Sequence, residues 1–185
     1  MTDQSAPGPL LLCIDMQPVF VNSVPDRDRL LSRCSFALEA ARGLGIQTLF
    51  TEQVPQKLGG TDEALLRLIE KPLQAGKATF SALADHGLRE LMLQRLGADH
   101  LILCGIETPI CVYQTAIDAI RSDIPVTLLS DCIGGRRSQD CADALDALKR
   151  AGAHVLPSES VFYSMLGDTA HPFFRDFTKL VKKYA

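Results

Sequence analysis

Short apolar runs alternate along the chain with longer segments in which apolar residues recur every three to four positions. The short runs are rich in Leu, Ile and Val, which is typical of strands, and they fall at residues 10–14, 46–51, 101–105, 125–130 and 153–156, with a weaker one at 73–76. The segments with helical spacing are residues 27–43, 62–70, 87–96, 109–122 and 138–151, followed by 160–184, which Pro172 interrupts. This alternation is typical of a doubly wound α/β fold.

The strand-like runs are apolar at nearly every position, which indicates burial on both faces and therefore a parallel sheet. We predict a three-layer, Rossmann-like α/β domain in which about six mostly parallel strands are flanked by helices. Thr61 and Ser138 are predicted helix N-caps, and Gly152 a predicted helix stop. The 185 residues fit one domain, 1–185, of which residues 1–8 are expected to be disordered.

Composition and charge narrow the function classes. The formal net charge of −3 argues against a nucleic-acid partner, for which a basic face is expected, so a small-molecule substrate is predicted. Residues 1–9 lack the basic and apolar regions of a signal peptide, and no apolar run approaches membrane-spanning length. We therefore expect a cytoplasmic protein that does not bind membranes and keeps its thiols reduced.

Cys111 is placed where α/β enzymes commonly present a nucleophile. The apolar run ends at Gly105, and a helix is predicted to begin with Thr108 as N-cap and Pro109 at the first helical position. Cys111 then lies on the first turn, where free backbone N–H groups and the helix dipole favour a thiolate. The carboxyl ends of parallel strands are also where such sheets bind ligands.

The chain has six cysteines, and packing explains several of them. Cys13 and Cys104 lie inside strand-like runs, and Cys34 lies on an amphipathic helix, so each is interpreted as a small buried hydrophobe. Cys132 and Cys141 flank a Gly-Gly turn and carry no clear signal. No C-x-x-C pair occurs and the four histidines show no ligand spacing, so neither a metal site nor a cofactor is expected.

Two charged residues, Asp15 and Lys77, become candidate site residues when they are considered together with Cys111. Asp15 ends the first apolar run and would emerge at the same sheet edge as Cys111, although a helix cap, a metal ligand or a solvated charge would also account for it. Lys77 follows Gly76 and precedes small residues, which indicates a tight loop, and a solvated lysine is the ordinary interpretation.

Asp15, Lys77 and Cys111 in these settings resemble the isochorismatase-like hydrolase superfamily, which includes nicotinamidases and N-carbamoylsarcosine amidases. The resemblance spans roughly residues 8–180. The segments that carry it are Ile14-Asp-Met-Gln17, Gly76-Lys77, Phe80-Ser81 and Cys104-Gly-Ile-Glu-Thr-Pro-Ile-Cys-Val112. Further segments are similar to the branch called isochorismatase domain-containing proteins: Thr51-Glu-Gln53 with Leu58-Gly59, Arg137-Ser-Gln139 and Ala170-His-Pro172.

The resemblance implies a catalytic triad. Asp15 would take the thiol proton, Cys111 would attack a carbonyl-type carbon, and Lys77 would orient Asp15 and offset developing charge. A nearby lysine would stabilise the thiolate, and that thiolate would make Asp15 a better base. The resemblance also implies a cis peptide bond between Ile106 and Glu107, with the N–H groups of Glu107 and Cys111 as oxyanion donors.

Two departures from the family narrow the predicted chemistry. Nicotinamidases place a metal through an Asp-x-His pair after the second strand, whereas this chain has Thr51-Glu-Gln-Val-Pro55 and no histidine before His86. Isochorismatases proper hydrolyse a vinyl ether and typically have glycine at the position of Cys111. We therefore predict hydrolysis of an amide, carbamoyl or related C–N bond through a thioester. Vinyl-ether hydrolysis and a redox-sensing binding scaffold are the alternatives.

The substrate pocket is predicted only in outline. Proximity in sequence to the triad suggests four substrate contacts, each of which core packing would also explain: Gln17, Phe20, Phe80 and Tyr113. Glu107 is a further polar candidate. Arg136 and Arg137 would bind an acidic substrate or a neighbouring subunit, or lie in a solvated turn. The resemblance implies a homo-oligomer, a dimer or a tetramer.

Overall fold

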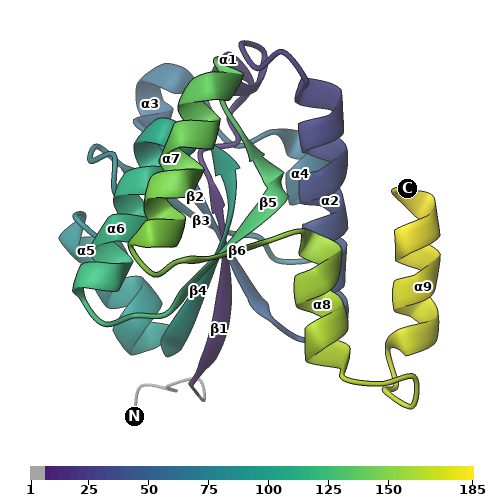
Figure 1. Ribbon diagram of the computed structural model, residues 1–185. Helices are drawn as coiled ribbons and strands as arrows, with labels where there is room; N and C mark the ends of the chain where they lie inside the picture. Colours follow the sequence, from purple (N-terminus) through teal and green to yellow (C-terminus); the bar gives the residue numbers. More distant parts are fainter. Residues whose placement is uncertain (1–6) are drawn as a thin grey trace.

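The computed structural model describes residues 7–185 and has six strands in one sheet (Figure 1). The strands are β1 (Gly8–Ile14), β2 (Gln47–Gln53), β3 (Leu73–Lys77), β4 (Ala98–Ile106), β5 (Val126–Gly134) and β6 (His154–Leu156). Their order is β3-β2-β1-β4-β5-β6, and every neighbouring pair is parallel. The predicted doubly wound α/β sheet is confirmed.

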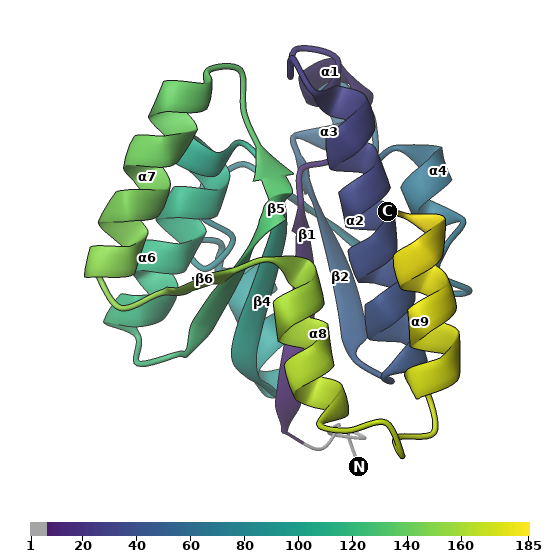
Figure 2. The same cartoon turned by 45° about the vertical axis from the view of Figure 1, so that its right-hand side comes forward.

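Helices cover both faces of the sheet, which gives the three predicted layers (Figures 1 and 2). One layer contains α1 (Pro18–Val21), α2 (Arg27–Gly43), α4 (Glu63–Leu66), α8 (Ser158–Leu166) and α9 (Phe174–Lys183). The other contains α5 (His86–Glu90), η1 (Leu91–Arg95), η2 (Thr108–Val112), α6 (Tyr113–Arg121) and α7 (Ser138–Arg150). The short α3 (Pro55–Leu58) follows β2.

Two apolar clusters, one on each side of the sheet, explain why the strand-like runs are continuously apolar. In β1, Leu11 and Cys13 pack into the cluster that contains α2, α8 and α9. Leu10 and Leu12, which alternate with them, pack into the cluster of α5, α6 and α7. Successive side chains of a strand point to opposite faces, so a strand buried on both sides needs apolar residues throughout.

Several predicted helix boundaries are wrong. The helical segment 62–70 is one turn, α4, and its N-cap is Asp62, which accepts a hydrogen bond from the Ala64 N–H at 2.8 Å. Thr61 instead donates from its N–H and hydroxyl to the Glu52 carboxylate. Ser138 is the first residue of α7 rather than its cap. Residues 160–184 form α8 and α9 with a break between them.

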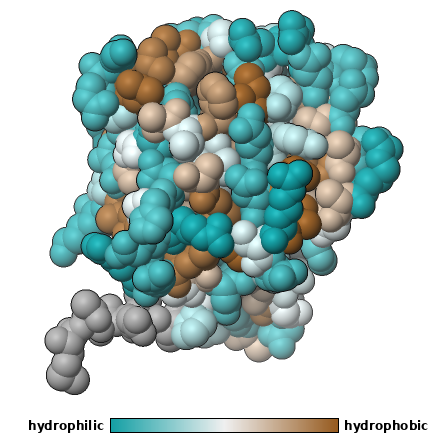
Figure 3. All heavy atoms as spheres, turned by 90° about the vertical axis from the view of Figure 1, so that its left-hand side faces the viewer, coloured by the Kyte–Doolittle hydropathy of each residue, from teal (hydrophilic) through white to brown (hydrophobic). Residues whose placement is uncertain are grey.

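Two further sequence predictions concern the first residues of the chain and membrane spans. Gly8 belongs to β1, so the predicted disordered segment does not reach residue 8, and residues 1–6 lie outside the described part of the chain. No described helix has the length and apolar character that a membrane span requires. Seen from the left of Figure 1, hydrophilic side chains separate the apolar areas of the surface (Figure 3).

Candidate active site

Four neighbouring strands bring the predicted catalytic residues to one edge of the sheet. Asp15 follows the last residue of β1, and Lys77 is the last residue of β3. Between those strands lies β2, whose Thr51 pairs in register with Ile14 and whose Gln53 pairs with Lys77. Cys111 comes from η2, which begins two residues after β4 ends. Because parallel strands share a carboxyl edge, residues far apart in sequence meet there.

The Asp15 carboxylate is buried and fully engaged. Its residue has a φ of +50°, a conformation that aspartate tolerates better than most side chains. The Thr51 hydroxyl donates to one carboxylate oxygen of Asp15 at 2.7 Å. The Lys77 ammonium donates to the other at 2.6 Å. The carboxylate is therefore held in one orientation from two sides.

Lys77 is a buried ion-pair partner, which corrects its interpretation as a solvated loop lysine. Its side chain is 0% exposed. Besides Asp15, its ammonium donates to the Gln53 side-chain oxygen at 2.6 Å and to the Thr79 carbonyl at 3.2 Å. All three ammonium donors thus have an acceptor, which a buried charge requires.

Cys111 lies near the start of a helix, but the cap differs from the prediction. The Thr108 hydroxyl donates to the Gly134 carbonyl at 3.0 Å instead of capping the helix. The Glu107 carbonyl accepts hydrogen bonds from the N–H groups of Ile110 at 3.0 Å and Val112 at 3.2 Å, on either side of Cys111. The Ile106–Glu107 peptide bond is cis, as the family resemblance implies.

The pKa of the Cys111 thiol is raised, contrary to the expectation that the helix start favours a thiolate. Burial, the largest cause, and then the negative charge of Asp15 raise the pKa of Cys111 to about 12, and the lowering effect of Lys77 is smaller than that of either. The Glu107 N–H has a smaller lowering effect on the pKa. Desolvation and a facing carboxylate therefore outweigh the helix start and the lysine.

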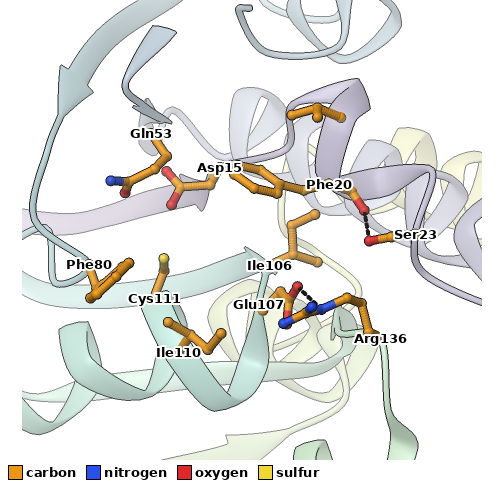
Figure 4. Close-up of a pocket in the computed structure, with 11 residues that line it drawn as sticks. Asp15, Phe20, Ser23, Gln53, Phe80, Ile106, Glu107, Ile110, Cys111 and Arg136 are labelled. Atoms are coloured by element: carbon orange, nitrogen blue, oxygen red, sulfur yellow. Dashed lines mark hydrogen bonds and ion pairs between the residues drawn. The ribbon is translucent and has the colours of Figure 1, made fainter. Parts of the chain in front are cut away.

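A cavity of about 390 Å³ opens above Asp15 and Cys111. Figure 4 shows the Cys111 sulfur pointing toward the Asp15 carboxylate, with Phe80 beside it. The lining residues are Asp15, Val19, Phe20, Ser23, Gln53, Phe80, Ile106, Glu107, Ile110, Cys111 and Arg136. Val19 and Phe80 are each more than half exposed, so the cavity has an apolar rim that a small molecule can reach.

Not every predicted contact residue reaches this cavity. Phe20 and Phe80 line it, but Gln17 and Tyr113 do not. The Gln17 amide donates to the carbonyls of Gln53 and Gly59 at 3.1 and 2.6 Å and accepts from the Gln53 N–H at 2.6 Å, so it holds the end of β2. Tyr113 packs against the apolar cluster on the α6 side.

Of the two arginines in the turn after β5, one lines the cavity and the other does not. Arg136 lines the cavity and forms an ion pair with Glu107 at 2.7 Å. Arg137 does not line it and pairs with Asp140 at 2.6 Å. The Arg136 side chain is 57% exposed and that of Arg137 is 76% exposed, so both lie in a solvent-exposed turn, each with an acidic partner.

The sequence analysis gave no role to Thr51 or Gln53, although both contact the triad. Thr51 bonds to Asp15, and Gln53 bonds to Lys77 and lines the cavity. Thr51 ends the predicted strand 46–51 and Gln53 ends the observed strand β2, so the edge rule that selected Asp15 would also have selected Thr51. Val19 and Ser23 follow Asp15 in and after a one-turn helix, where no periodic pattern marks them.

No group of three or more His, Cys, Asp or Glu residues is arranged to hold a metal ion within residues 7–185. Glu52 belongs to the segment 51–55, which lacks the Asp-x-His metal pair of nicotinamidases. Its carboxylate accepts hydrogen bonds from Thr61 and Gln74. The polar or reactive side chains that line the cavity are those of Asp15, Ser23, Gln53, Glu107, Cys111 and Arg136.

Comparison with known proteins gives a consistent family. Residues 9–160 match the family described as Isochorismatase domain. Isochorismatase domain-containing protein 2 of Bos taurus is 34% identical over 174 residues, which covers 94% of this chain and 82% of the relative.

Solved structures share the fold. A structure described as MAR1 ribonuclease from Caenorhabditis elegans has a TM-score of 0.86 at 28% identity and covers 96% of this chain and 92% of its own. A zinc complex of pyrazinamidase from Pyrococcus horikoshii has a TM-score of 0.69 at 22% identity, and covers 82% of this chain and 99% of its own.

Proposed function

The chain belongs to the isochorismatase domain family, and on that basis we propose that it is a cysteine hydrolase that cleaves an amide, carbamoyl or related C–N bond of a small molecule. The observation that carries the proposal is that the Cys111 sulfur faces the Asp15 carboxylate, which also bonds to the Lys77 ammonium. The likeness to the pyrazinamidase is one of fold alone, so the proposal rests on these residues.

In the proposed first step, the Cys111 sulfur attacks the carbonyl carbon while its proton passes to Asp15. Because the pKa of the thiol is raised to about 12, we expect this transfer to accompany the attack. The charge that develops on the substrate oxygen is stabilised by the N–H groups of Glu107 and Cys111. Lys77 offsets the charge of Asp15 before the transfer and holds the carboxyl group in place afterwards.

The tetrahedral intermediate then loses its nitrogen. The C–N bond breaks, Asp15 returns the proton to the leaving amine or ammonia, and the acyl group remains on the sulfur as a thioester. Water attacks that thioester with Asp15 as its base, which releases the acid and restores the thiol. One carboxylate thus serves as base, acid and base again.

The raised pKa of Cys111 bears on the redox-sensing alternative. Oxidants react with thiolates, and sensor cysteines are typically exposed and low in pKa. Cys111 is 8% exposed and its pKa is raised to about 12. These properties favour a thiol that is activated only when a substrate is bound. The predicted homo-oligomer and cytoplasmic location stay predictions.

The test of the proposal is the Cys111→Ala variant, assayed for ammonia release from small amides and carbamoyl compounds. We expect the variant to lose turnover by about a thousandfold or more, with an unchanged circular dichroism spectrum. Mass spectrometry of the active protein with a good substrate should find an acyl group on Cys111.

Cys141→Ala is the matched control, because Cys141 is only partly buried and lies outside the cavity lining. It should leave turnover unchanged. Undiminished activity in Cys111→Ala would contradict the thioester mechanism, and isochorismate cleavage that survives this change would identify vinyl-ether hydrolysis instead.

A further inference from the structure

The charged groups of the cavity are matched in pairs. The charged residues among its described lining are Asp15, Glu107 and Arg136. Asp15 is neutralised from below by Lys77. Glu107 is neutralised by Arg136, whose guanidinium lies 2.7 Å from its carboxylate (Figure 4). The lining therefore presents no unpaired charge to an incoming molecule.

The two residues of the Glu107–Arg136 ion pair differ in their exposure to solvent. The Glu107 side chain is 11% exposed, whereas that of Arg136 is 57% exposed. A largely buried carboxylate needs a cation close by, so Glu107 retains Arg136. Without Glu107, the Arg136 guanidinium would be available to bind an anionic substrate. In the structure its charge is paired with the Glu107 carboxylate instead.

The other walls are mainly apolar: Val19, Phe20, Phe80, Ile106 and Ile110. Figure 4 shows Phe80 and Ile110 on either side of Cys111, with Phe20 and Ile106 across the cavity. A carboxylate placed among these side chains would lose water without gaining an unpaired cation, which is unfavourable. An aliphatic group would bury apolar surface there, which is favourable.

We infer that the Glu107–Arg136 ion pair determines specificity: it makes the cavity selective for uncharged amides with an apolar acyl group and excludes amides that carry an acidic group. The inference rests on the proposed function for the identity of the reacting bond. It goes further in giving the Glu107 side chain a role as a positioning residue that acts through Arg136.

Alkylation of Cys111 tests this selectivity without requiring turnover. Iodoacetamide and iodoacetate react alike, since the sulfur loses its proton and displaces iodide, but only iodoacetate is an anion. The rate of Cys111 alkylation by iodoacetamide is divided by the rate of its alkylation by iodoacetate, both measured by mass mapping. This ratio is then divided by the same ratio for glutathione, which gives a normalised preference for iodoacetamide. Because both reagents use the same thiolate, this normalised preference does not depend on the pKa of Cys111.

We expect Cys111 to prefer iodoacetamide by about tenfold beyond the preference of glutathione. Glu107→Gln frees Arg136 and should lower that preference by about tenfold, while Arg136→Gln leaves Glu107 unpaired and should raise it. General damage to the site would not move the two variants in opposite directions. Asp140→Asn is the matched control, because it frees Arg137, which lies outside the cavity lining, and it should not change the preference.

Hydrolysis of two amides completes the test. Succinamate and 4-methylpentanamide have the same number of heavy atoms, with a carboxylate in one and an isopropyl group in the other. The unmodified protein should cleave 4-methylpentanamide in preference, and Glu107→Gln should shift the kcat/KM ratio toward succinamate.

The outcomes separate the inference from the proposed function. A normalised alkylation preference near one, unmoved by Glu107→Gln and Arg136→Gln, would overturn the inference whether or not amides are cleaved. Selective alkylation with opposite shifts in the two variants, but no cleavage of either amide, would support the charge selectivity of the cavity and count against the proposed amidase activity.

Discussion

Cys111 differs from the buried cysteines in what it faces. Cys13, Cys34 and Cys104 are fully buried, as their packing interpretation predicted, and Cys132 is buried with them. Burial raises the pKa of Cys132 well above its ordinary value, and the carboxylate that its thiol contacts, Asp131, lies outside the cavity lining. Cys111 also has a raised pKa, but it and its neighbour Asp15, a carboxylate that can accept the proton, both line the cavity. Its reactivity therefore depends on proton transfer rather than on a stable thiolate.

Asp15→Asn should separate two effects of the Asp15 carboxylate: its charge raises the pKa of Cys111, and in the proposed mechanism it is the base. Removal of that charge should therefore lower the pKa of Cys111 and speed iodoacetamide alkylation at pH 7.5 by about tenfold for each unit of change. The same variant should lose hydrolysis, because the base is gone. Rates at Cys111 are measured across pH 6–10 by mass mapping.

Asp62→Asn, which replaces a carboxylate outside the cavity lining, serves as the control and should leave alkylation unchanged. Slower alkylation of Asp15→Asn would mean that Asp15 activates the thiol even without substrate, contrary to the pKa direction. Asp15→Asn also leaves Lys77 buried without its counter-charge, which destabilises the fold, so both proteins are compared well below their unfolding temperatures.

At the scale of elements, the close contact between β1 and β4 depends on one glycine. Gly105 has a φ of +108°, and a Cβ there would lie 2.1 Å from the Ile14 carbonyl oxygen. Both the backbone conformation and the space therefore exclude a side chain. Ile14 immediately precedes Asp15, so this contact affects where the Asp15 carboxylate leaves its strand.

Gly105→Ala should destabilise the protein by about 4 kcal/mol or more, because relief of the clash would move the backbone of β1. Gly45→Ala is its matched control, since Gly45 has a φ of +71° but no atom within 4 Å of an added Cβ. That change should cost about 1–2 kcal/mol from conformation alone. Urea unfolding measures both, and equal losses would show that the contact with Ile14 carries no weight.

The elements also show which features a sequence can predict. The range of α2 was predicted to the residue, because buried residues such as Leu30, Cys34 and Ala41 recur at helical spacing. The helix expected over 62–70 ends after one turn, because the N–H groups of Leu68 and Ile69 bond three residues back, as in turns, instead of four. Lys77 was misinterpreted because β3 is mostly exposed and has little apolar pattern. Gln17 and Tyr113 are near the triad in sequence, but side-chain direction depends on tertiary contacts that sequence proximity does not reveal.

At the scale of the whole molecule, Arg33 ties the carboxyl-terminal helices to the sheet. From α2 it forms an ion pair with Asp131 of β5 at 2.8 Å and donates to the Ser158 hydroxyl at 2.9 Å and the Tyr184 carbonyl at 3.1 Å. The Asp131 carboxylate also accepts from the Ser158 N–H at 2.7 Å. These contacts lie on the side of the sheet covered by α8 and α9, and they form a polar network separate from the one around Asp15 and Lys77.

The buried thiols predict how stability depends on pH. Hydrogen bonding to Cys104 and burial raise the pKa of Cys34 well above its ordinary value, so the folded state keeps a proton that the unfolded state releases. The contribution is fully present below the unfolded pKa of about 8.5 and is lost as pH rises toward the folded value. The free energy of unfolding should therefore fall above about pH 9.

Urea unfolding between pH 7 and 10.5 measures this dependence. Cys34→Ala should be less stable at pH 7, because it leaves a small cavity, but its stability should fall less steeply with pH, by up to about 1.4 kcal/mol per unit for one proton. An unchanged slope in Cys34→Ala would show that this thiol does not contribute to the alkaline loss.

One residue of the proposed catalytic triad, Lys77, belongs to the edge strand of the sheet. In the strand order β3 is terminal, with β2 as its neighbour, and of its five residues only Lys77 is buried. Strands with so little buried apolar surface open locally at a lower free energy than the core. Opening of β3 would withdraw Lys77 from Asp15 while the rest of the sheet stays folded.

Thermal inactivation should therefore precede thermal unfolding. Hydrolysis, measured at each temperature, would decline over a range in which the far-ultraviolet circular dichroism of the helices is still unchanged, and the amide hydrogens of β3 would exchange in the same range. Coincident loss of activity and helix signal would instead mean that β3 is as stable as the core. The heat tolerance of this protein as a catalyst is thus expected to be set by one five-residue strand rather than by the apolar layers that hold the molecule together.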